Sequence, residues 1–200
     1  GYGVCPQAGE GRRAALLALF GVGDLQEKVI GAMTLEKIQV QMYAALAYGV
    51  KGLSYYTSYG LFLDADGYVT DLYEPLTALN GRVKNIGGYL FDKEPEALYH
   101  SGLNREAEMA YFLDDAGASP LIAEMPENMI VGLFRQGDTR VLMVVNKNYR
   151  RAVSGDLILR EKKKVGVFDG SAGTVSKGNE PTDRIGLELA AGECAVYILE

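Results

Sequence analysis

The sequence predicts an α/β segment followed by an all-β segment. Up to about residue 92, apolar residues at helical spacing alternate with short uncharged runs that are typical of strands. After Pro95 the pattern changes to short apolar runs with turn residues between them, which predicts an antiparallel β-sandwich. We therefore expect two domains, residues 1–95 and residues 96–200.

The first part of the α/β segment holds one expected strand and one expected helix. Residues 2–5 (YGVC) have the pattern of a strand end, and residues 12–20 (RRAALLALF) have the pattern of a helix. Residues 21–23 (GVG) then end that helix, because glycine is unfavourable inside helices.

A longer helix is expected from about residue 35 to residue 48. Thr34 is a suitable N-cap, and Glu36 places a carboxylate in the first turn, where it suits the helix dipole. Gly49 accepts the left-handed backbone that ends many helices. The apolar residues that recur at helical spacing are Leu35, Ile38, Met42, Ala45 and Leu46.

The next expected element is a strand at residues 52–59 (GLSYYTSY). It contains aromatic and β-branched residues and no charge, which indicates burial on both faces, as in a parallel sheet. Strand alternation places Tyr56 on the side of the serines and places Tyr55 and Tyr59 on the opposite side.

A turn and a second long helix follow. Residues 64–67 (DADG) have the composition of a turn, and a helix is expected at residues 71–91. Asp71 followed by Glu74 is similar to a capping box, and Pro75 lies in the first turn, where its missing N–H is harmless. The apolar face of this helix comprises Leu72, Leu76, Leu79, Val83, Ile86 and Leu90.

The all-β segment contains short strand candidates with turns between them. Residues 101–118 are expected to be a connector, and the basic run at residues 160–164 (REKKK) a solvated turn between two strands. The expected turns are at residues 136–138, 146–148, 169–170 and 191–193. The expected strands are at residues 129–135, 140–146, 152–159, 164–168, 185–189 and 195–199.

Composition argues against several classes of function. The chain has 200 residues and a formal net charge of −6, whereas a nucleic-acid surface needs a basic stripe. It has no run of about 18 apolar residues, so we expect no membrane-spanning helix. The two cysteines, Cys5 and Cys194, lack metal or redox spacing, and His100 is the only histidine. Residues 64–67 lack the later Glu of a calcium loop, so neither a metal nor a cofactor is expected.

Two blocks of the α/β segment resemble the end of a (β/α)8-barrel glycoside hydrolase of the β-galactosidase-like and related kinds. Residues 34–60 contain the run ALAYGVKG followed by an aromatic strand. Residues 71–90 (DLYEPLTALNGRVKNIGGYL) resemble the last helix of such barrels. By this resemblance, residues 52–59 are the eighth barrel strand, residues 71–91 are the eighth helix, and residues 4–8 (VCPQA) end the seventh strand.

The all-β segment is similar to the sandwich that follows such barrels. The amylase-type C-terminal domain has the same plan, so an amylase-like parent stays open as an alternative. The similar runs are VGLF at residues 131–134, VLMVVNKN at residues 141–148, VFDG at residues 167–170 and LAAGE at residues 189–193.

The resemblance implies hydrolysis of glycosidic bonds, with retention, by two carboxylates that commonly come from the fourth and seventh strands. A complete barrel needs about 250 residues, whereas residues 1–95 cover only its last units and lack the fourth strand. We therefore interpret the chain as the C-terminal part of a carbohydrate-active hydrolase and expect the isolated chain to be inactive. The alternative is a non-catalytic carbohydrate-binding or structural module.

Four residues are candidates for the sugar site that the resemblance implies. Gln7 and Glu10 would follow the seventh strand at the catalytic face, Gln7 as a partner of a sugar hydroxyl and Glu10 as one carboxylate of the pair. Tyr56 and Tyr59 would lie near the barrel mouth, where aromatic rings cover the apolar faces of sugars. The expected partners are a carbohydrate substrate and either the missing barrel portion or a second copy of the chain. The sequence does not indicate a cellular compartment.

Overall fold

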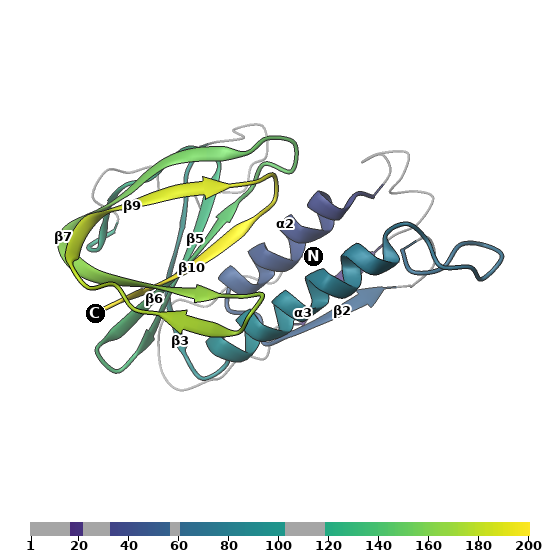
Figure 1. Ribbon diagram of the computed structural model, residues 1–200, viewed down its shortest axis with the longest axis horizontal. Helices are drawn as coiled ribbons and strands as arrows, with labels where there is room; N and C mark the ends of the chain where they lie inside the picture. Colours follow the sequence, from purple (N-terminus) through teal and green to yellow (C-terminus); the bar gives the residue numbers. More distant parts are fainter. Residues whose placement is uncertain (1–16, 22–32, 57–60, 103–118) are drawn as a thin grey trace.

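The computed structural model describes residues 17–21, 33–56, 61–102 and 119–200 (Figure 1). The first described elements alternate between strand and helix: β1 (Leu17–Gly21), α2 (Leu35–Ala47), β2 (Gly52–Tyr56) and α3 (Tyr73–Leu90). The strands that follow are β3 (Glu94–His100), β4 (Ile122–Glu124), β5 (Met129–Gln136), β6 (Thr139–Asn146), β7 (Val153–Asp169), β8 (Thr174–Ser176), β9 (Pro181–Leu189) and β10 (Cys194–Leu199).

The α/β segment forms one small parallel unit. β1 and β2 pair in parallel, from Leu17 opposite Gly52 to Gly21 opposite Tyr56, and α2 connects them. The predicted alternation of strands and helices is thus present, but no (β/α)8 barrel is evident in the described residues. The described part of the chain is mostly β, and a curled antiparallel sheet with two helices replaces the predicted combination of partial barrel and sandwich.

The antiparallel sheet curls over on itself through one long strand. Its order is β3-β5-β6-β10-β7-β4, and β8 and β9 also pair with β7. β7 has 17 residues. Its first half pairs with β9 and β4, and its last residues pair with β10 and β8. The sheet therefore forms two layers that share β7.

Side chains of the inner strands are buried on both faces of the sheet. In β6, Val141, Met143 and Val145 belong to a cluster with the helices, whereas Leu142 and Val144 belong to the cluster between the two layers. This double burial explains why the apolar run of β6 is continuous rather than alternating.

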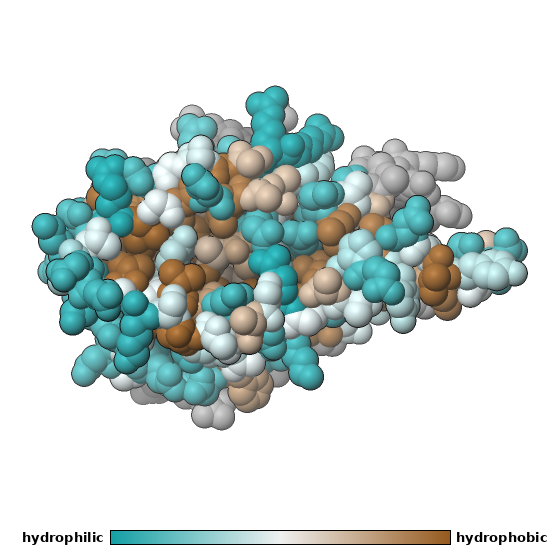
Figure 2. All heavy atoms as spheres, viewed as in Figure 1, coloured by the Kyte–Doolittle hydropathy of each residue, from teal (hydrophilic) through white to brown (hydrophobic). Residues whose placement is uncertain are grey.

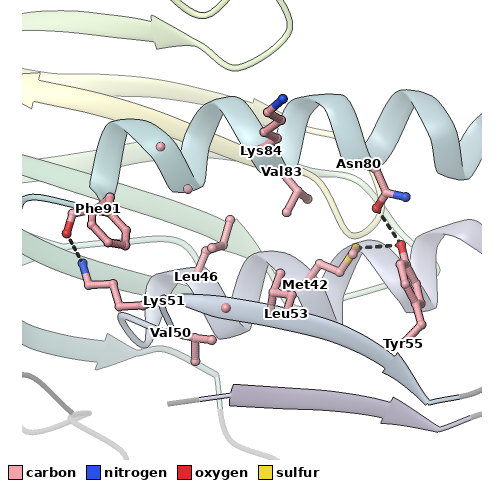
Figure 3. A pocket seen from close by; sticks show the side chains of 13 residues that line it. Met42, Leu46, Val50, Lys51, Leu53, Tyr55, Asn80, Val83, Lys84 and Phe91 are labelled. Carbon is pink, nitrogen blue, oxygen red and sulfur yellow. Dashed lines mark hydrogen bonds between the residues drawn. The ribbon is translucent and has the colours of Figure 1, made fainter. Parts of the chain in front are cut away.

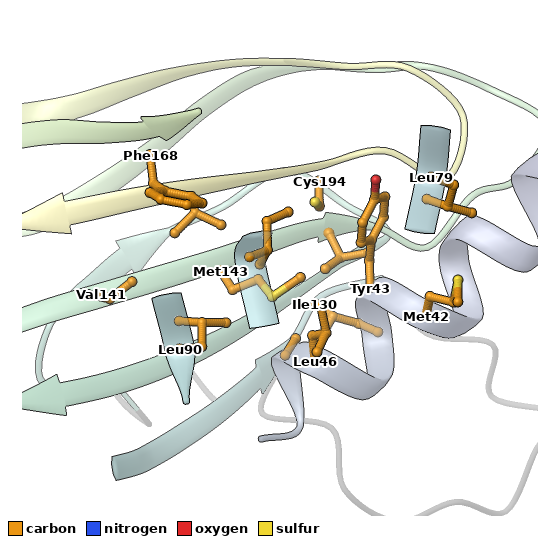
Figure 4. Packing of buried hydrophobic residues seen from close by; sticks show 14 of the residues in the cluster. Met42, Tyr43, Leu46, Leu79, Leu90, Ile130, Val141, Met143, Phe168 and Cys194 are labelled. Carbon is orange, nitrogen blue, oxygen red and sulfur yellow. The ribbon is translucent and has the colours of Figure 1, made fainter. Parts of the chain in front are cut away.

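The two helices pack directly on one face of the antiparallel sheet (Figure 4). Met42 and Leu46 of α2 share a buried cluster with Ile130 of β5 and Met143 of β6. The approach is close enough to exclude side chains, because a Cβ at Gly132 of β5 would lie 2.2 Å from the carbonyl oxygen of Ala47. The α/β segment and the sheet thus share one core. The division into domains at residue 95 remains a prediction.

The signals for helix ends were right for α2 and partly wrong for α3. Thr34 caps α2 by accepting a hydrogen bond from the backbone N–H of Lys37, and Gly49 has a φ of +82° beyond its C-terminus. The N-cap of α3 is Leu72, which makes no side-chain cap, so the predicted capping box at Asp71 does not form. Of the predicted apolar face, Leu76, Leu79, Ile86 and Leu90 are buried.

Two further predictions were wrong where pairing between distant segments decides the local structure. Residues 17–20, predicted as helical, form β1 because they pair with β2. Residues 160–164, predicted as a turn, lie inside β7, although their side chains are mostly exposed as expected. The connector predicted at residues 101–118 lies almost entirely outside the described residues.

Candidate functional site

The candidate site is the carboxyl edge of the parallel pair. Parallel strands of α/β folds place their ligand sites at the carboxyl ends, because the connecting loops meet there. β1 ends at Gly21 and β2 ends at Tyr56, and these two residues are register partners, so both strands end at the same edge. The segment that leads from β2 to α3, which includes residues 61–72, starts from this edge (Figure 1).

The predicted site residues are only partly placed. Gln7, Glu10 and Tyr59 lie outside the described residues. The backbone of Tyr56 is the last position of β2 and lies at the carboxyl edge, but its side chain is not among those described. The sugar-binding and carboxylate roles of these four residues therefore remain predictions.

Tyr55 lies on the side of β2 that faces the helices, as strand alternation predicts. Its hydroxyl donates a hydrogen bond to Oδ1 of Asn80 in α3 at 2.7 Å and lies 3.6 Å from Sδ of Met42 in α2 (Figure 3). Burial raises the pKa of Tyr55 above its usual value, so the hydroxyl stays protonated. Ser54, on the opposite face, is exposed, so the predicted burial of this strand on both faces is wrong for the described residues.

A groove of about 340 Å³ runs between α2, β2 and α3 (Figure 3). Its apolar wall includes Leu46, Leu53 and Val83, and Lys51 lies at one end of it. Nζ of Lys51 donates to the carbonyl oxygens of Leu90 at 2.9 Å, Phe91 at 2.8 Å and Lys93 at 3.3 Å. The ammonium group thus satisfies carbonyl groups at the C-terminus of α3, where the helix dipole favours a positive charge.

Replacing Lys51 by methionine is expected to lower the free energy of unfolding by about 1–2 kcal/mol, because three carbonyl groups lose a charged donor. Urea unfolding followed by circular dichroism measures the change. Lys84→Met is the matched control, since Lys84 also lines the groove but is exposed, and we expect a change within about 0.5 kcal/mol. Equal effects of the two substitutions would contradict the capping role of Lys51.

The segment after β2 contains a hydrogen-bonded hairpin, residues 61–70. Oδ1 of Asp64 accepts hydrogen bonds from the backbone N–H groups of Asp66 at 3.0 Å and Tyr68 at 2.8 Å. The N–H of Asp64 donates to the carbonyl oxygen of Tyr68 at 2.8 Å, and Gly67 has a φ of +86°. The predicted turn is therefore confirmed, and its tip is held by its own backbone and one carboxylate.

Aromatic contacts fix the base of the hairpin. The ring of Phe62 lies edge-to-face against Tyr55 of β2, with centroids 5.0 Å apart, and edge-to-face against Tyr73 of α3, with centroids 6.4 Å apart. Leu61 is buried. The hairpin therefore has a defined position relative to β2 and α3.

Two other polar groups lie away from this edge. Oη of Tyr48 and Nε2 of His100 share a hydrogen bond of 2.9 Å near the amino end of β2. Burial, together with the charge of Lys147, lowers the pKa of His100 to about 4, so the ring is neutral at pH 7. Burial likewise raises the pKa of the Cys194 thiol, which lies in the core beside α2. His100 and Cys194 are both buried, and neither is part of the candidate site.

Within the described ranges, no three side chains of His, Cys, Asp or Glu lie close enough together to hold a metal ion. Asp64 and Asp66 form the predicted turn. No helix in the same ranges is long and apolar enough to cross a membrane.

The comparisons with known proteins show similarity in fold alone. No protein-family model matches the sequence, and no curated protein sequence matches it. A γ-CGTase from alkalophilic Bacillus clarkii has a TM-score of 0.50 at 10% identity over 83% of this chain. An α-amylase from Geobacillus thermoleovorans has a TM-score of 0.46 at 13% identity over 86% of this chain. A GH30 subfamily 8 xylanase from Clostridium acetobutylicum has a TM-score of 0.38 at 10% identity over 83% of this chain.

The chain corresponds to only a part of each of these enzymes. It spans 23% of the γ-CGTase, 35% of the α-amylase and 38% of the xylanase. At these identities the γ-CGTase supports a shared fold with a portion of that enzyme and does not identify a reaction.

Proposed function

We propose that the chain is the C-terminal part of a carbohydrate-active glycoside hydrolase. The observation that carries the proposal is the order and packing of its elements: a parallel β-α-β unit and a further helix, followed by an antiparallel sheet on which both helices lie. A portion of the γ-CGTase has a similar fold, which supports this reading by analogy of fold. β1 and β2 would then be the last two strands of a barrel whose other strands come from outside residues 17–200.

The exposed face of β2 supports this assignment. A closed barrel buries the side chains that point inward, and small residues suit its crowded interior. Ser54 is small and lies exposed on the face of β2 opposite the helices, which is the face that would point into the barrel. In the described residues, β2 also pairs with only one strand, so one of its edges would accept another.

The reaction of the complete enzyme would be retaining hydrolysis by an acid/base carboxylate and a nucleophilic carboxylate. In this arrangement β1, rather than residues 4–8, would be the seventh strand. Gln7 and Glu10 would then precede that strand instead of following it, so the carboxylate pair would come from other strands of the barrel, while Tyr56 and Tyr59 would contact the sugar. The antiparallel sheet would hold the last two helices in place, because the shared core joins Tyr43 of α2 and Leu79 of α3 to β-strand residues.

The second candidate is a carbohydrate-binding module without catalysis. The observation that favours it is the large exposed tyrosine at the tip of the hairpin, Tyr68, which would bind sugar without a carboxylate pair. The hydrolase would need further βα units to complete its barrel, whereas the binding module would not.

The test is to express the reading frame that encodes this chain together with its in-frame upstream sequence, and to assay it on nitrophenyl α- and β-glycosides. We expect turnover by the longer product and none by the 200-residue chain alone, because two carboxylates are required. A longer product without turnover would favour the binding module. Turnover by the 200-residue chain that vanished in Glu10→Gln would show instead that the chain contains a complete site.

A further inference from the structure

The hairpin of residues 61–70 carries an exposed aromatic and apolar surface. Tyr68 is 72% exposed and Val69 is 64% exposed, and Leu63 lies opposite Val69 in the bridge that closes the hairpin. The hairpin projects beyond the helices and away from the antiparallel sheet, at the right of Figure 1. At the same end of the molecule, Figure 2 shows apolar surface beside hydrophilic surface.

The hairpin that carries these exposed side chains is held by hydrogen bonds and ring contacts. The tip is held by the bonds of Asp64 to the backbone of Asp66 and Tyr68, and the base by the Phe62 ring between Tyr55 and Tyr73. A backbone that is already fixed in position has less conformational entropy to lose when a flat ligand covers the ring that it carries. The hairpin therefore presents Tyr68 from a pre-formed backbone support.

The charges in the sequence of the hairpin and of the segments that flank it restrict the chemistry of a ligand. Residues 52–81 contain no Lys, Arg or His, and their four acidic residues give a formal charge of −4: Asp64, Asp66, Asp71 and Glu74. Carboxylates accept hydrogen bonds and repel anions, so phosphate-rich and acidic ligands are disfavoured. The charges leave neutral and cationic ligands, and a neutral sugar would place its apolar face on the ring and its hydroxyl groups on the carboxylates.

We propose that this hairpin is a binding platform for a neutral polysaccharide chain, with one sugar ring stacked on Tyr68 and its hydroxyl groups donating to the neighbouring carboxylates. The choice of a sugar rather than a cation rests on the proposed function. The hairpin follows the carboxyl end of β2, so the platform lies beside the edge at which the candidate site is placed.

The test is affinity electrophoresis of the 200-residue chain in gels that contain soluble starch, neutral arabinoxylan or mixed-linkage β-glucan. We expect one of these polymers to retard the chain, with at least about fivefold weaker binding in Tyr68→Ala and near-normal binding in Tyr68→Phe, which keeps the ring. Phe91→Ala is the matched control, because Phe91 is 64% exposed at the far end of α3 and its loss should leave binding unchanged. Tyr68 is so exposed that its substitution should not alter the melting temperature.

Two results would overturn the proposal at once: no retardation by any of the three polymers, or equal retardation of the wild type and Tyr68→Ala. A third would be binding of oligolysine, but of no polysaccharide, that is lost in Tyr68→Ala. The last result would identify a cationic ligand instead.

The binding platform and the hydrolase can each be disproved without the other. Turnover by the longer product with an unchanged polysaccharide KM in Tyr68→Ala would remove the platform and keep the hydrolase. Retardation that depends on Tyr68, without turnover by the longer product, would keep the platform and remove the hydrolase.

Discussion

Replacing Gly132 by alanine is expected to lower the free energy of unfolding by about 1–3 kcal/mol. A Cβ at this position of β5 would lie 2.2 Å from the carbonyl oxygen of Ala47 and 2.9 Å from its carbonyl carbon. These are backbone atoms at the C-terminus of α2, so no side-chain rotation relieves the clash, and the helix has to move away from the sheet. Valine adds two methyl groups at the same place, so we expect Gly132→Val to be more destabilising than the alanine variant.

Gly186→Ala is the matched control for this prediction. Gly186 is also an interior strand glycine, in β9, but the nearest atom to a Cβ there is Oδ1 of Asp156 at 3.9 Å. Alanine at this position is expected to be neutral or to stabilise by up to about 1 kcal/mol, because glycine weakens strands. Urea unfolding measures the free energy of unfolding of both variants. If the Gly132→Ala variant is no less stable than the Gly186→Ala variant, α2 does not pack on β5 this closely.

Elements with strong local signals were predictable from the sequence. α2 has an N-cap at Thr34, apolar residues at helical spacing and a stop at Gly49, and all three signals act within the helix itself. β5 and β6 were predicted to within one residue, because their apolar runs are long and a Gln-Gly-Asp turn separates them.

Elements that depend on distant partners were not predictable in the same way. β1 has a helix-like composition, and only its pairing with β2 makes it a strand. The charged run in the middle of β7 has the composition of a turn, yet Lys164 exchanges backbone hydrogen bonds of 3.1 and 3.0 Å with Glu200, which keeps the chain extended. Neither partner can be identified from the local sequence.

The candidate site shows the same division. Alternation along β2 predicted the side on which Tyr55 lies, whereas the capping role of Lys51 depends on carbonyl groups about 40 residues away and has no local signal. Tyr68 is not among the predicted site residues, although an aromatic residue directly after an Asp-Gly turn indicates a ring at a hairpin tip. This signal predicts that Tyr68 lies near the tip of a hairpin, but the exposure of its side chain becomes known only from the fold.

The fragment of residues 94–200, which begins with β3, shows whether the helices and the sheet share one core. This fragment retains the cluster between the two sheet layers, so we expect a cooperative thermal transition. It loses α2 and α3, however, and exposes the apolar residues Ile130, Val141, Met143, Val196 and Ile198.

The measurement is the melting temperature of the fragment and of the whole chain, with light scattering to determine the mass of each in solution. We predict that the fragment melts more than about 10 °C below the whole chain and self-associates, because each exposed core side chain forfeits about 1.5–3 kcal/mol of burial. A monomeric fragment that melted at the same temperature as the whole chain would contradict a shared core, since the helices would then contribute nothing to the core of the sheet.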